Sequence, residues 1–356
     1  MPEMNAEQTH IDITAVEAGL SRAVAGDRFS GVVHLAQGNE VLFEQACGVA
    51  SRRWNIPVKT STRFDVASVT KLFTSAAVLQ QVDAGALSLE SRITELVDLS
   101  GTQISTDVTI RHLLTHTSGI ADDADEEADE SYEALWVERP NYSVTETADF
   151  LPQFVHKPAN FAPGDDCRYC NVGYILAGLA LESVTGGSYR DYVRKHVFGR
   201  AGMRKSGFFD MREAVPDVAE GWDPVSGGGW KQNIYSYPPI GSPDGGAHVT
   251  ASDLVRFLQA LRGGVLLSPE LTTEFLTPQV KHHDSNDGGA IHFSYGLEFE
   301  IRSDGGIRSF YKDGVNTGAS AIVRYYPELD AALAVVANSE NGAWDPVKAI
   351  DAIIPG

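Results

Sequence analysis

Residues 65–74 read Asp-Val-Ala-Ser-Val-Thr-Lys-Leu-Phe-Thr, and this stretch decides how the rest of the chain is interpreted. Apolar residues recur at helical spacing from residue 69 to 82, so a helix is predicted to start beside Ser68. A three-residue step then places Ser68 and Lys71 side by side on one helical face. A desolvated lysine with a lowered pKa can take the proton of a serine hydroxyl, and a helix N-terminus favours negative charge near Ser68. The plainer interpretation is a capped helix start with a surface lysine, because Ser-x-x-Lys arises by chance in many chains.

A second group of polar residues, Tyr169 and Asn171, flanks Cys170 and directly precedes a helix predicted over residues 172–184. A tyrosine held near a lysine can be partly phenolate and act as a general base, and an asparagine amide can bind both lysine and substrate. Taken alone, the pattern is explained as well by a helix N-cap at Asn171 after a buried Tyr169.

The third group is Lys312, Asp313 and Gly314, on a strand that ends at the turn of residues 315–318. Residues two apart share one face of a strand, so Lys312 can point into a cleft where Gly314 leaves room for a substrate backbone. An ordinary surface turn with Asp-Gly chemistry is the alternative.

The three groups occur together in this order, and the chain thereby resembles the serine beta-lactamase superfamily. The branch concerned holds class C beta-lactamases, D-alanyl-D-alanine carboxypeptidases, D-aminopeptidases and lactamase-like esterases. The stretches between the groups are similar too, notably TIRHLLTHTSGI at 109–120, PGDDCRYCNVGY at 163–174 and GGAHVTASDLVRF at 245–257.

The resemblance implies a serine hydrolase that forms an acyl-enzyme on Ser68 and acts as an esterase or a D-amino-acid amidase or peptidase on small esters or amides. It assigns catalysis to three side chains and substrate binding to four, and the oxyanion hole to two backbone N–H groups that stabilise the tetrahedral oxyanion. By this resemblance the catalytic residues are Ser68 (nucleophile), Lys71 (activator) and Tyr169 (general base). The substrate-binding residues are Asn171, Lys312, Asp313 and Gly314. The oxyanion hole is formed by the backbone N–H groups of Ser68 and Val315. One alternative is a penicillin-interactive beta-lactamase or D,D-carboxypeptidase. Another is a non-catalytic ligand-binding or sensor domain on the same fold.

Asp313 departs from the pattern of that branch, in which a threonine usually stands between the cation and the glycine. A carboxylate there would repel an anionic substrate by on the order of a few kcal/mol, which disfavours penicillin-like substrates. Facing the site, it could instead accept an ammonium group, and Asp313→Thr would then lose activity on free-amine substrates. Strict strand alternation would turn Asp313 away from the cleft and weaken this argument.

Both ends of the chain are predicted to form strands, at residues 29–36, 41–50, 309–312, 319–326 and 331–338, whereas helices are predicted for the middle, including residues 251–262. The fold class is therefore α+β, with an antiparallel sheet from both chain ends, flanking helices and a mostly helical insertion. This is the beta-lactamase/transpeptidase-like architecture that the resemblance implies. We expect residues 1–58 and 300–356 to form the sheet domain, residues 59–299 the helical domain, and a cleft to lie between them.

The chain of 356 residues has a formal net charge of -20, with 28 basic and 48 acidic residues. This charge disfavours nucleic acid, and the partner expected is a small ester, amide or short peptide. Part of the acidic excess lies in residues 122–130, which are predicted to form a solvated loop. No membrane partner is expected, because no long apolar run is present, and residues 1–10 lack a leader pattern, so a cytoplasmic location is expected.

No cofactor and no metal are expected. His112 and His116 have i, i+4 spacing but no accompanying general-base glutamate, so a structural role is favoured. Cys167 and Cys170 bracket Tyr169 and are interpreted as packing residues rather than a redox or zinc motif. With Cys47 they make three cysteines, which implies no disulfide framework.

Overall fold

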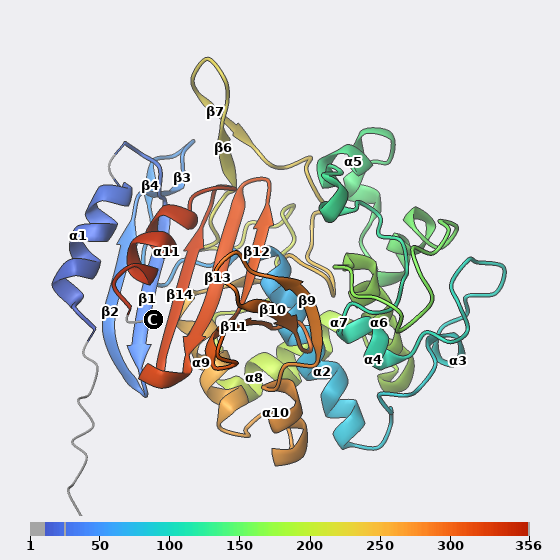
Figure 1. Cartoon of the computed structure of the whole chain (residues 1–356). Coiled ribbons are helices and arrows are strands. Elements are labelled where there is room, and N and C mark those ends of the chain that lie inside the picture. The colour runs from blue at the N-terminus through green and yellow to red at the C-terminus, as the bar shows by residue number, and fades with distance from the viewer. Residues whose placement is uncertain (1–10, 25, 355–356) are drawn as a thin grey trace, which may run out of the picture.

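An eight-stranded antiparallel sheet dominates the computed structural model, which describes residues 11–24 and 26–354. Its strand order is β2-β1-β14-β13-β12-β11-β10-β9, so the first and last strands of the chain lie beside each other at one side (Figure 1). The bounds are β1 Gly31–Gln37, β2 Glu40–Cys47, β9 Val280–Asp284, β10 Ala290–Phe293, β11 Glu298–Ile301, β12 Ile307–Asn316, β13 Ala319–Tyr326 and β14 Ala331–Ala337. The expected sheet from both chain ends is confirmed. Residues 1–10, in which no leader pattern was found, lie outside the described residues.

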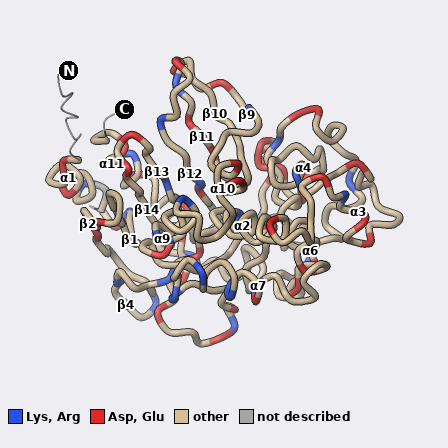
Figure 2. Tube along the Cα trace, turned by 90° about the horizontal axis from the view of Figure 1, so that it is seen from below, with Lys and Arg blue, Asp and Glu red and all other residues tan. Residues whose placement is uncertain are grey.

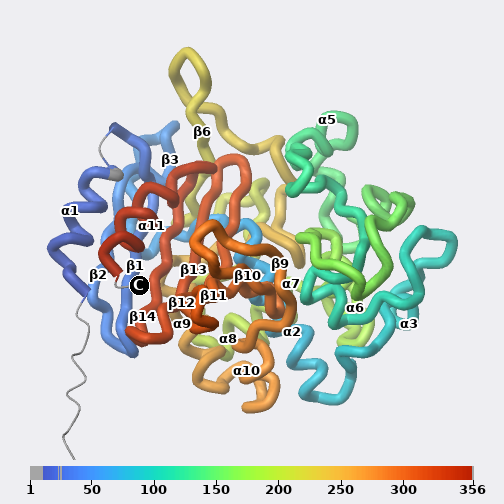
Figure 3. The backbone as a smooth tube through the Cα atoms, viewed as in Figure 1, coloured from blue at the N-terminus to red at the C-terminus, as the bar shows by residue number. Residues whose placement is uncertain are grey.

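Strand β14 joins the two ends of the chain. It pairs with β1 through contacts such as Val33 opposite Val335, and with β13 through contacts such as Val323 opposite Ala334. Figure 3 shows the blue N-terminal and red C-terminal segments side by side as a result. β14 is buried along its whole length, which explains why it reads as a continuous apolar run rather than an alternating one.

Helices cover both faces of this sheet. Val33 and Leu333 belong to the apolar cluster under α1 (Ile13–Val24) and α11 (Trp344–Asp351). Their neighbours Val32 and Ala334 belong to the larger cluster on the opposite face, as the two-residue period of a strand requires. That second cluster includes α2 (Thr70–Asp83) and α9 (Ala251–Arg262), so the main core lies between the sheet and the helices of the middle of the chain.

The three predicted helices are present as α2, α9 and α6 (Asn171–Thr185). Further short helices complete this part: α3 Ile93–Leu96, α4 Ile110–Leu114, α5 Leu135–Glu138, α7 Tyr189–Tyr192, α8 Gly199–Ala201 and α10 Pro269–Phe275. Three small two-stranded sheets join them: β3 Val49–Ser51 with β4 Ile56–Pro57, β5 Phe64–Asp65 with β8 His248–Val249, and β6 Trp222–Pro224 with β7 Trp230–Gln232. The insertion is therefore mostly helical, as expected, with short strands at its junctions.

The sheet extends further back along the chain than the predicted boundary at residue 300. Strand β9 begins at Val280 and pairs with β10, β10 pairs with β11, and β11 pairs with β12, for example Phe299 opposite Phe310. The boundary therefore cuts through the sheet. Their alternation is weak because these short strands are half-exposed, and sequence pattern alone did not reveal them.

Figure 2 shows Asp and Glu positions spread along many parts of the trace rather than confined to one segment. Within the described residues, no helix combines the length and the apolar character that crossing a membrane requires.

Candidate active site

Ser68 lies in a single 3-10 turn, η1 (Ala67–Val69), between the end of β5 and the start of α2. The preceding residue, Ala67, has φ +43°, in the left-handed region that a side chain rarely adopts. The Asp65 carboxylate supports this turn, because its Oδ1 accepts a hydrogen bond from the Ala67 backbone N–H at 2.7 Å. The strained turn presents the Ser68 hydroxyl, half-buried, at the head of α2.

Lys71 is fully buried directly beside Ser68. Its Nζ donates to Ser68 Oγ at 2.9 Å, to Asn171 Oδ1 at 2.7 Å and to the Asp244 carbonyl at 2.7 Å. Burial lowers the pKa of Lys71 from its ordinary value, although nearby carboxylates oppose the shift. The juxtaposition expected from the three-residue step is therefore present, and the capped-surface-lysine alternative is wrong because this lysine is buried.

Tyr169 stands over both lysines of the site. The Lys71 Nζ lies 5.1 Å and the Lys312 Nζ 4.8 Å from the centre of its ring, and the His116 ring stacks on it at 4.6 Å. Burial raises the pKa of Tyr169 well above its ordinary value, although Lys312 and the Ser68 hydroxyl oppose the shift. The phenol is thus neutral in the resting enzyme, which differs from the partial phenolate considered from the sequence.

His116 fixes the backbone on the far side of this tyrosine. Its Nδ1 accepts a hydrogen bond from the Cys170 N–H at 3.1 Å, which leaves the proton of a neutral ring on Nε2. Burial lowers the pKa of His116 well below its ordinary value, so the neutral ring is the form that stacks on Tyr169. Because α4 ends at Leu114, His112 and His116 do not share a helix face, and His112 Nδ1 accepts from Thr109 N–H instead.

Asn171 begins helix α6 and is held by the acidic segment 122–130. Asp122 Oδ2 accepts from the Asn171 N–H at 2.8 Å and from its Nδ2 at 3.1 Å, and Glu126 Oε1 accepts from the same Nδ2 at 2.8 Å. These bonds orient the amide so that its Oδ1 faces Lys71. Asp122 also accepts from the Val172 N–H at 2.9 Å and so caps the helix start.

The prediction that residues 122–130 form only a solvated loop is therefore wrong at its start. Asp122 and Asp123 are 4% and 3% exposed, and burial raises the pKa of Asp122 to about 6. The free N–H groups at the start of α6 and the charge of the buried Lys71 provide the partners that make burial of Asp122 tolerable. Composition alone could not reveal this, because those partners lie about fifty residues away in the chain.

Lys312 points from β12 toward the same site and is 2% exposed. Its Nζ donates to Glu298 Oε1 of β11 at 2.7 Å and lies 3.5 Å from Asp313 Oδ1. The cation is thus paired with carboxylates, and those carboxylates raise the pKa of Lys312 well above its ordinary value. Asp313 is 40% exposed in its side chain and, like Lys312, is absent from the pocket lining described below.

Gly314 and Val315 bring the edge of β12 against the nucleophile. A Cβ on Gly314 would stand 2.3 Å from the Val66 carbonyl oxygen and 2.7 Å from the Ser68 nitrogen, so only glycine allows this approach. Asn316 and Ala319 close a two-residue turn and form a hydrogen-bonded pair of the antiparallel ladder. The next pair, Val315 and Ser320, is therefore a non-hydrogen-bonded pair. The Val315 N–H then points away from β13, toward the edge of β12 that faces Ser68.

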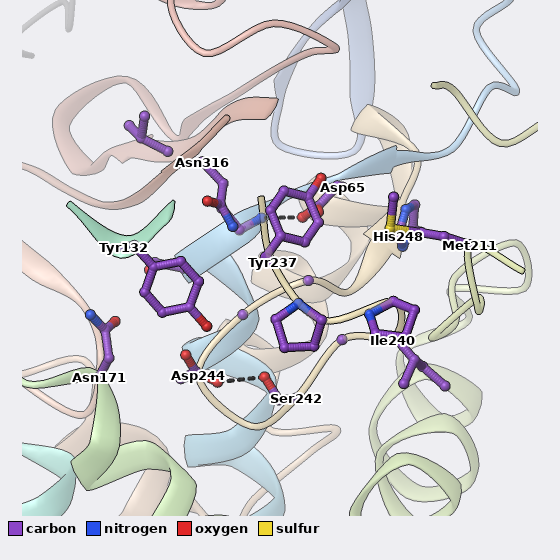
Figure 4. A pocket seen from close by; sticks show the side chains of 18 of the residues that line it. Asp65, Tyr132, Asn171, Met211, Tyr237, Ile240, Ser242, Asp244, His248 and Asn316 are labelled. Atoms are coloured by element: carbon purple, nitrogen blue, oxygen red, sulfur yellow. Dashed lines mark hydrogen bonds between the residues drawn. The ribbon is translucent and has the colours of Figure 1, made fainter. Parts of the chain in front are cut away.

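A pocket of about 70 Å³ opens in front of Ser68. Ser68, Asn171 and Val315, which the sequence had assigned to the site, lie in its wall. Among the further lining residues are Glu126, Tyr132 and Asp244, which the sequence had not assigned to the site, and Tyr237 (Figure 4). Figure 4 shows the Tyr132 hydroxyl directed toward Asp244, whose carboxylate accepts from Ser242 Oγ at 2.5 Å. We call this the nucleophile pocket.

The three cysteines are all free. Burial raises the pKa of Cys167 to about 12, and Cys170 is buried with its thiol directed at the Ile120 carbonyl. Both are thus poor thiolates, in keeping with packing roles. Among the described residues, no group of three or more His, Cys, Asp or Glu side chains is arranged to hold a metal.

A family model described as Beta-lactamase matches residues 15–355. The chain is 26% identical over 315 residues to penicillin-binding protein 4* of Bacillus subtilis, covering 84% of this chain and 66% of that protein. It is 30% identical over 283 residues to esterase EstB of Burkholderia gladioli, covering 72% and 71%. The crystal structure of a penicillin binding protein from Bacillus halodurans superposes with a TM-score of 0.88 at 37% identity, covering 95% of this chain and all of that one.

The chain therefore belongs to the beta-lactamase family, whose members named here include both penicillin-binding proteins and an esterase. It spans just under two thirds of the length of the Bacillus subtilis relative.

Proposed function

We propose that the protein is a serine hydrolase that forms an acyl-enzyme on Ser68 and cleaves small esters or amides. The observation that carries this proposal is the 2.9 Å contact between Ser68 Oγ and the buried Lys71 Nζ, whose pKa is lowered. A buried amine with a lowered pKa is the kind of base that can activate a serine hydroxyl near neutral pH.

In the acylation step, neutral Lys71 keeps its two N–H groups on Asn171 Oδ1 and the Asp244 carbonyl. Its lone pair takes the proton from Ser68 Oγ as that oxygen attacks the substrate carbonyl carbon. The carbonyl π electrons move onto oxygen, where the N–H groups of Ser68 and Val315 stabilise the negative charge. The tetrahedral intermediate then collapses, the bond to the leaving group breaks, and the leaving group receives a proton. Water repeats the sequence on the acyl-enzyme and releases the acid.

Tyr169 was expected from the family resemblance to be the general base, and that role stays a prediction. The raised pKa of Tyr169 and the lowered pKa of Lys71 favour Lys71 as the first proton acceptor. A neutral phenol between Lys71 and Lys312 suits the second transfer, in which it donates its proton to the leaving group and is reprotonated by Lys71.

The charges around Lys312 favour neutral or cationic substrates. Glu298 and Asp313 already neutralise its ammonium, so it offers less attraction to a substrate carboxylate than an unpaired lysine would. An esterase or D-amino-acid amidase is thus favoured over a penicillin-interactive enzyme. Because the chain is similar to penicillin-binding proteins, a penicillin-interactive enzyme is the second candidate, and the experiment below includes a substrate for it.

The test compares initial rates of wild type and Ser68→Ala on p-nitrophenyl acetate and butyrate, D- and L-alanine p-nitroanilides, and nitrocefin. Turnover that Ser68→Ala abolishes supports the serine mechanism, and the preferred substrate separates esterase, amidase and lactamase. If neither protein turns over any of these and no fluorophosphonate attaches to Ser68, the non-catalytic sensor interpretation becomes the better one.

A further inference from the structure

A second cavity adjoins the nucleophile pocket. It encloses about 280 Å³, and four residues line both spaces: Asp65, Met211, Tyr237 and His248 (Figure 4). These shared residues make it a neighbour of the catalytic serine rather than a separate surface hollow.

Asp65 and His248 face each other in the wall between the two spaces. They form a directly opposed pair between strands β5 and β8, so their side chains lie on the same side of that small sheet. Each is only 8% exposed. The position of Asp65 is further restrained because its Oδ1 holds the Ala67 N–H.

Both side chains keep a buried polar atom without a hydrogen-bond partner in the described part of the chain. These atoms are Asp65 Oδ2 and His248 Nδ1. The Tyr237 hydroxyl accepts a hydrogen bond from Asn233 Nδ2 and lies within reach of a side-chain hydrogen bond to the Asp65 carboxylate, so a ligand donor on Asp65 Oδ2 would bind beside this hydroxyl. Buried polar atoms are normally paired, so this carboxylate oxygen and ring nitrogen point to a hydrogen-bond donor supplied by a ligand.

The charges of the residues that line the second cavity indicate the charge of that ligand. Of the described residues that line it, four are acidic, namely Asp65, Asp210, Glu213 and Glu220, and none is Lys or Arg. Arg212 pairs with Asp210 from the outside, and the nearby Arg63 donates to the Pro216 carbonyl while covering the Phe209 ring. The Asp65 carboxylate is thus left for a cation that carries its own N–H donors.

We propose that the second cavity extends the substrate site and binds a protonated primary amine of the substrate, with the ammonium group on Asp65 Oδ2 and beside His248. The proposal rests on the proposed function and names its substrate class as esters or amides that carry an amine. It places the ammonium on Asp65 rather than on Asp313, which is paired with Lys312 and lies outside the lining of both spaces.

Binding is tested first without turnover. Calorimetry on the Ser68→Ala protein compares benzylammonium with benzyl alcohol, a neutral ligand of similar shape. Hydrogen bonds to charged groups are strong enough that we expect benzylammonium to bind about tenfold tighter or more. Asp65→Asn should abolish this preference while keeping the acceptor for the Ala67 N–H. Asp304 lies in the turn between β11 and β12, outside the linings of both cavities. Asp304→Asn removes the same charge as Asp65→Asn, and this control variant should retain the preference for benzylammonium.

Met211→Lys provides a second variant, because Met211 is 36% exposed and lines both spaces, so a lysine can be accommodated. Its ammonium should compete for Asp65 and weaken benzylammonium binding about tenfold. Equal binding of the amine and the alcohol to the Ser68→Ala protein overturns the proposal. A preference that survives in folded Asp65→Asn and Met211→Lys proteins also overturns it.

The link to substrate is tested with ω-amino acyl p-nitroanilides of increasing chain length and their N-acetyl counterparts. For the chain length that fits, the ratio of kcat/KM for amine over acetylated substrate should fall about tenfold in Asp65→Asn and stay unchanged in Asp304→Asn. A ratio that does not move overturns the substrate extension. Absence of any wild-type turnover contradicts the proposed function instead, while the calorimetry still reports on the cavity.

Discussion

Burial of a single amine decides the chemistry available to this site. Lys71 is enclosed by α2, α6 and the loop before β8, and its loss of hydration favours the neutral form. The surrounding carboxylates of Asp122, Glu126 and Asp244 oppose this shift, so the position of the proton on Lys71 reflects a balance between desolvation and charge.

Lys71→Arg should remove the base while keeping the positive charge. A guanidinium stays protonated, so it cannot accept the Ser68 proton, and kcat/KM for p-nitrophenyl acetate should fall by about 10²–10⁴-fold. In wild type, kcat/KM should rise with pH as Lys71 deprotonates, and the midpoint should lie below the ordinary lysine value of 10.5. The measurement is a pH–rate profile for both proteins.

Lys157→Arg is the matched control for this prediction. Lys157 is half-buried and donates to the Asp122 and Asp123 carbonyls. Near-wild-type activity of Lys71→Arg would falsify the base assignment.

Glu298→Gln should change which substrate charge is accepted. The variant loses the carboxylate 2.7 Å from Lys312 Nζ, so the cation becomes more attractive to a substrate carboxylate. We expect the ratio of kcat/KM for nitrocefin over p-nitrophenyl acetate to rise by about tenfold, or about 1.4 kcal/mol. Glu300→Gln, on the same strand but bonded to Ser309 and paired with Arg324, should leave the ratio unchanged. An unchanged or lower ratio in Glu298→Gln would show that Lys312 does not select substrate charge.

At the scale of elements, the site is the meeting point of one strand edge and one helix start. β12 reaches η1 because Gly314 has no side chain, and Val315 of β12 and Ser68 of η1 line the same pocket. In the proposed mechanism each element supplies one of the two oxyanion donors, so neither would be sufficient alone.

Gly314→Ala should separate these two donors. The new Cβ would need to displace the Val66 carbonyl, which a Cβ would approach to 2.3 Å, and so would push β12 away from η1. Loss or displacement of one oxyanion donor costs about 10²–10³ in kcat, and we expect a loss in this range.

Gly187→Ala is the control, because a Cβ there meets nothing within 4 Å. Steady-state rates and thermal melts of both variants provide the measurement. Wild-type activity in a folded Gly314→Ala protein would mean that the approach of β12 is not needed.

At the scale of the whole molecule, the formal charge of -20 acts against compactness. The acidic residues, whose positions along the trace Figure 2 marks in red, repel one another, and salt shortens the range of that repulsion from about 30 Å at 0.01 M to about 8 Å at 0.15 M.

The melting temperature should therefore rise between about 0.01 and 0.15 M NaCl. The exposed ion pairs weaken over the same range, but such pairs contribute only about 0–1 kcal/mol each. Differential scanning calorimetry in NaCl and in KCl provides the measurement, and agreement between the two salts excludes binding of a specific ion. A melting temperature that falls with salt would show that ion pairs outweigh the net repulsion.

Several features of this molecule follow from the sequence by itself. Residues 65–74, 163–174 and 312–314 identified the family and the Ser68–Lys71 contact, and local periodicity predicted the first hairpin, the last strands and helices α2, α6 and α9. These features are accessible because they depend on neighbours within a few residues along the chain, where strand and helix periods act.

The tertiary structure alone decided the electrostatic surroundings of the site. It placed Glu298 on Lys312, the buried start of the acidic segment on Asn171, and His248 opposite Asp65. Each of these pairs joins residues from different elements, so it depends on sheet register and helix packing rather than on local pattern. In the first two cases the polar groups could be buried because folding brought opposite charges and hydrogen-bond donors together from distant parts of the chain.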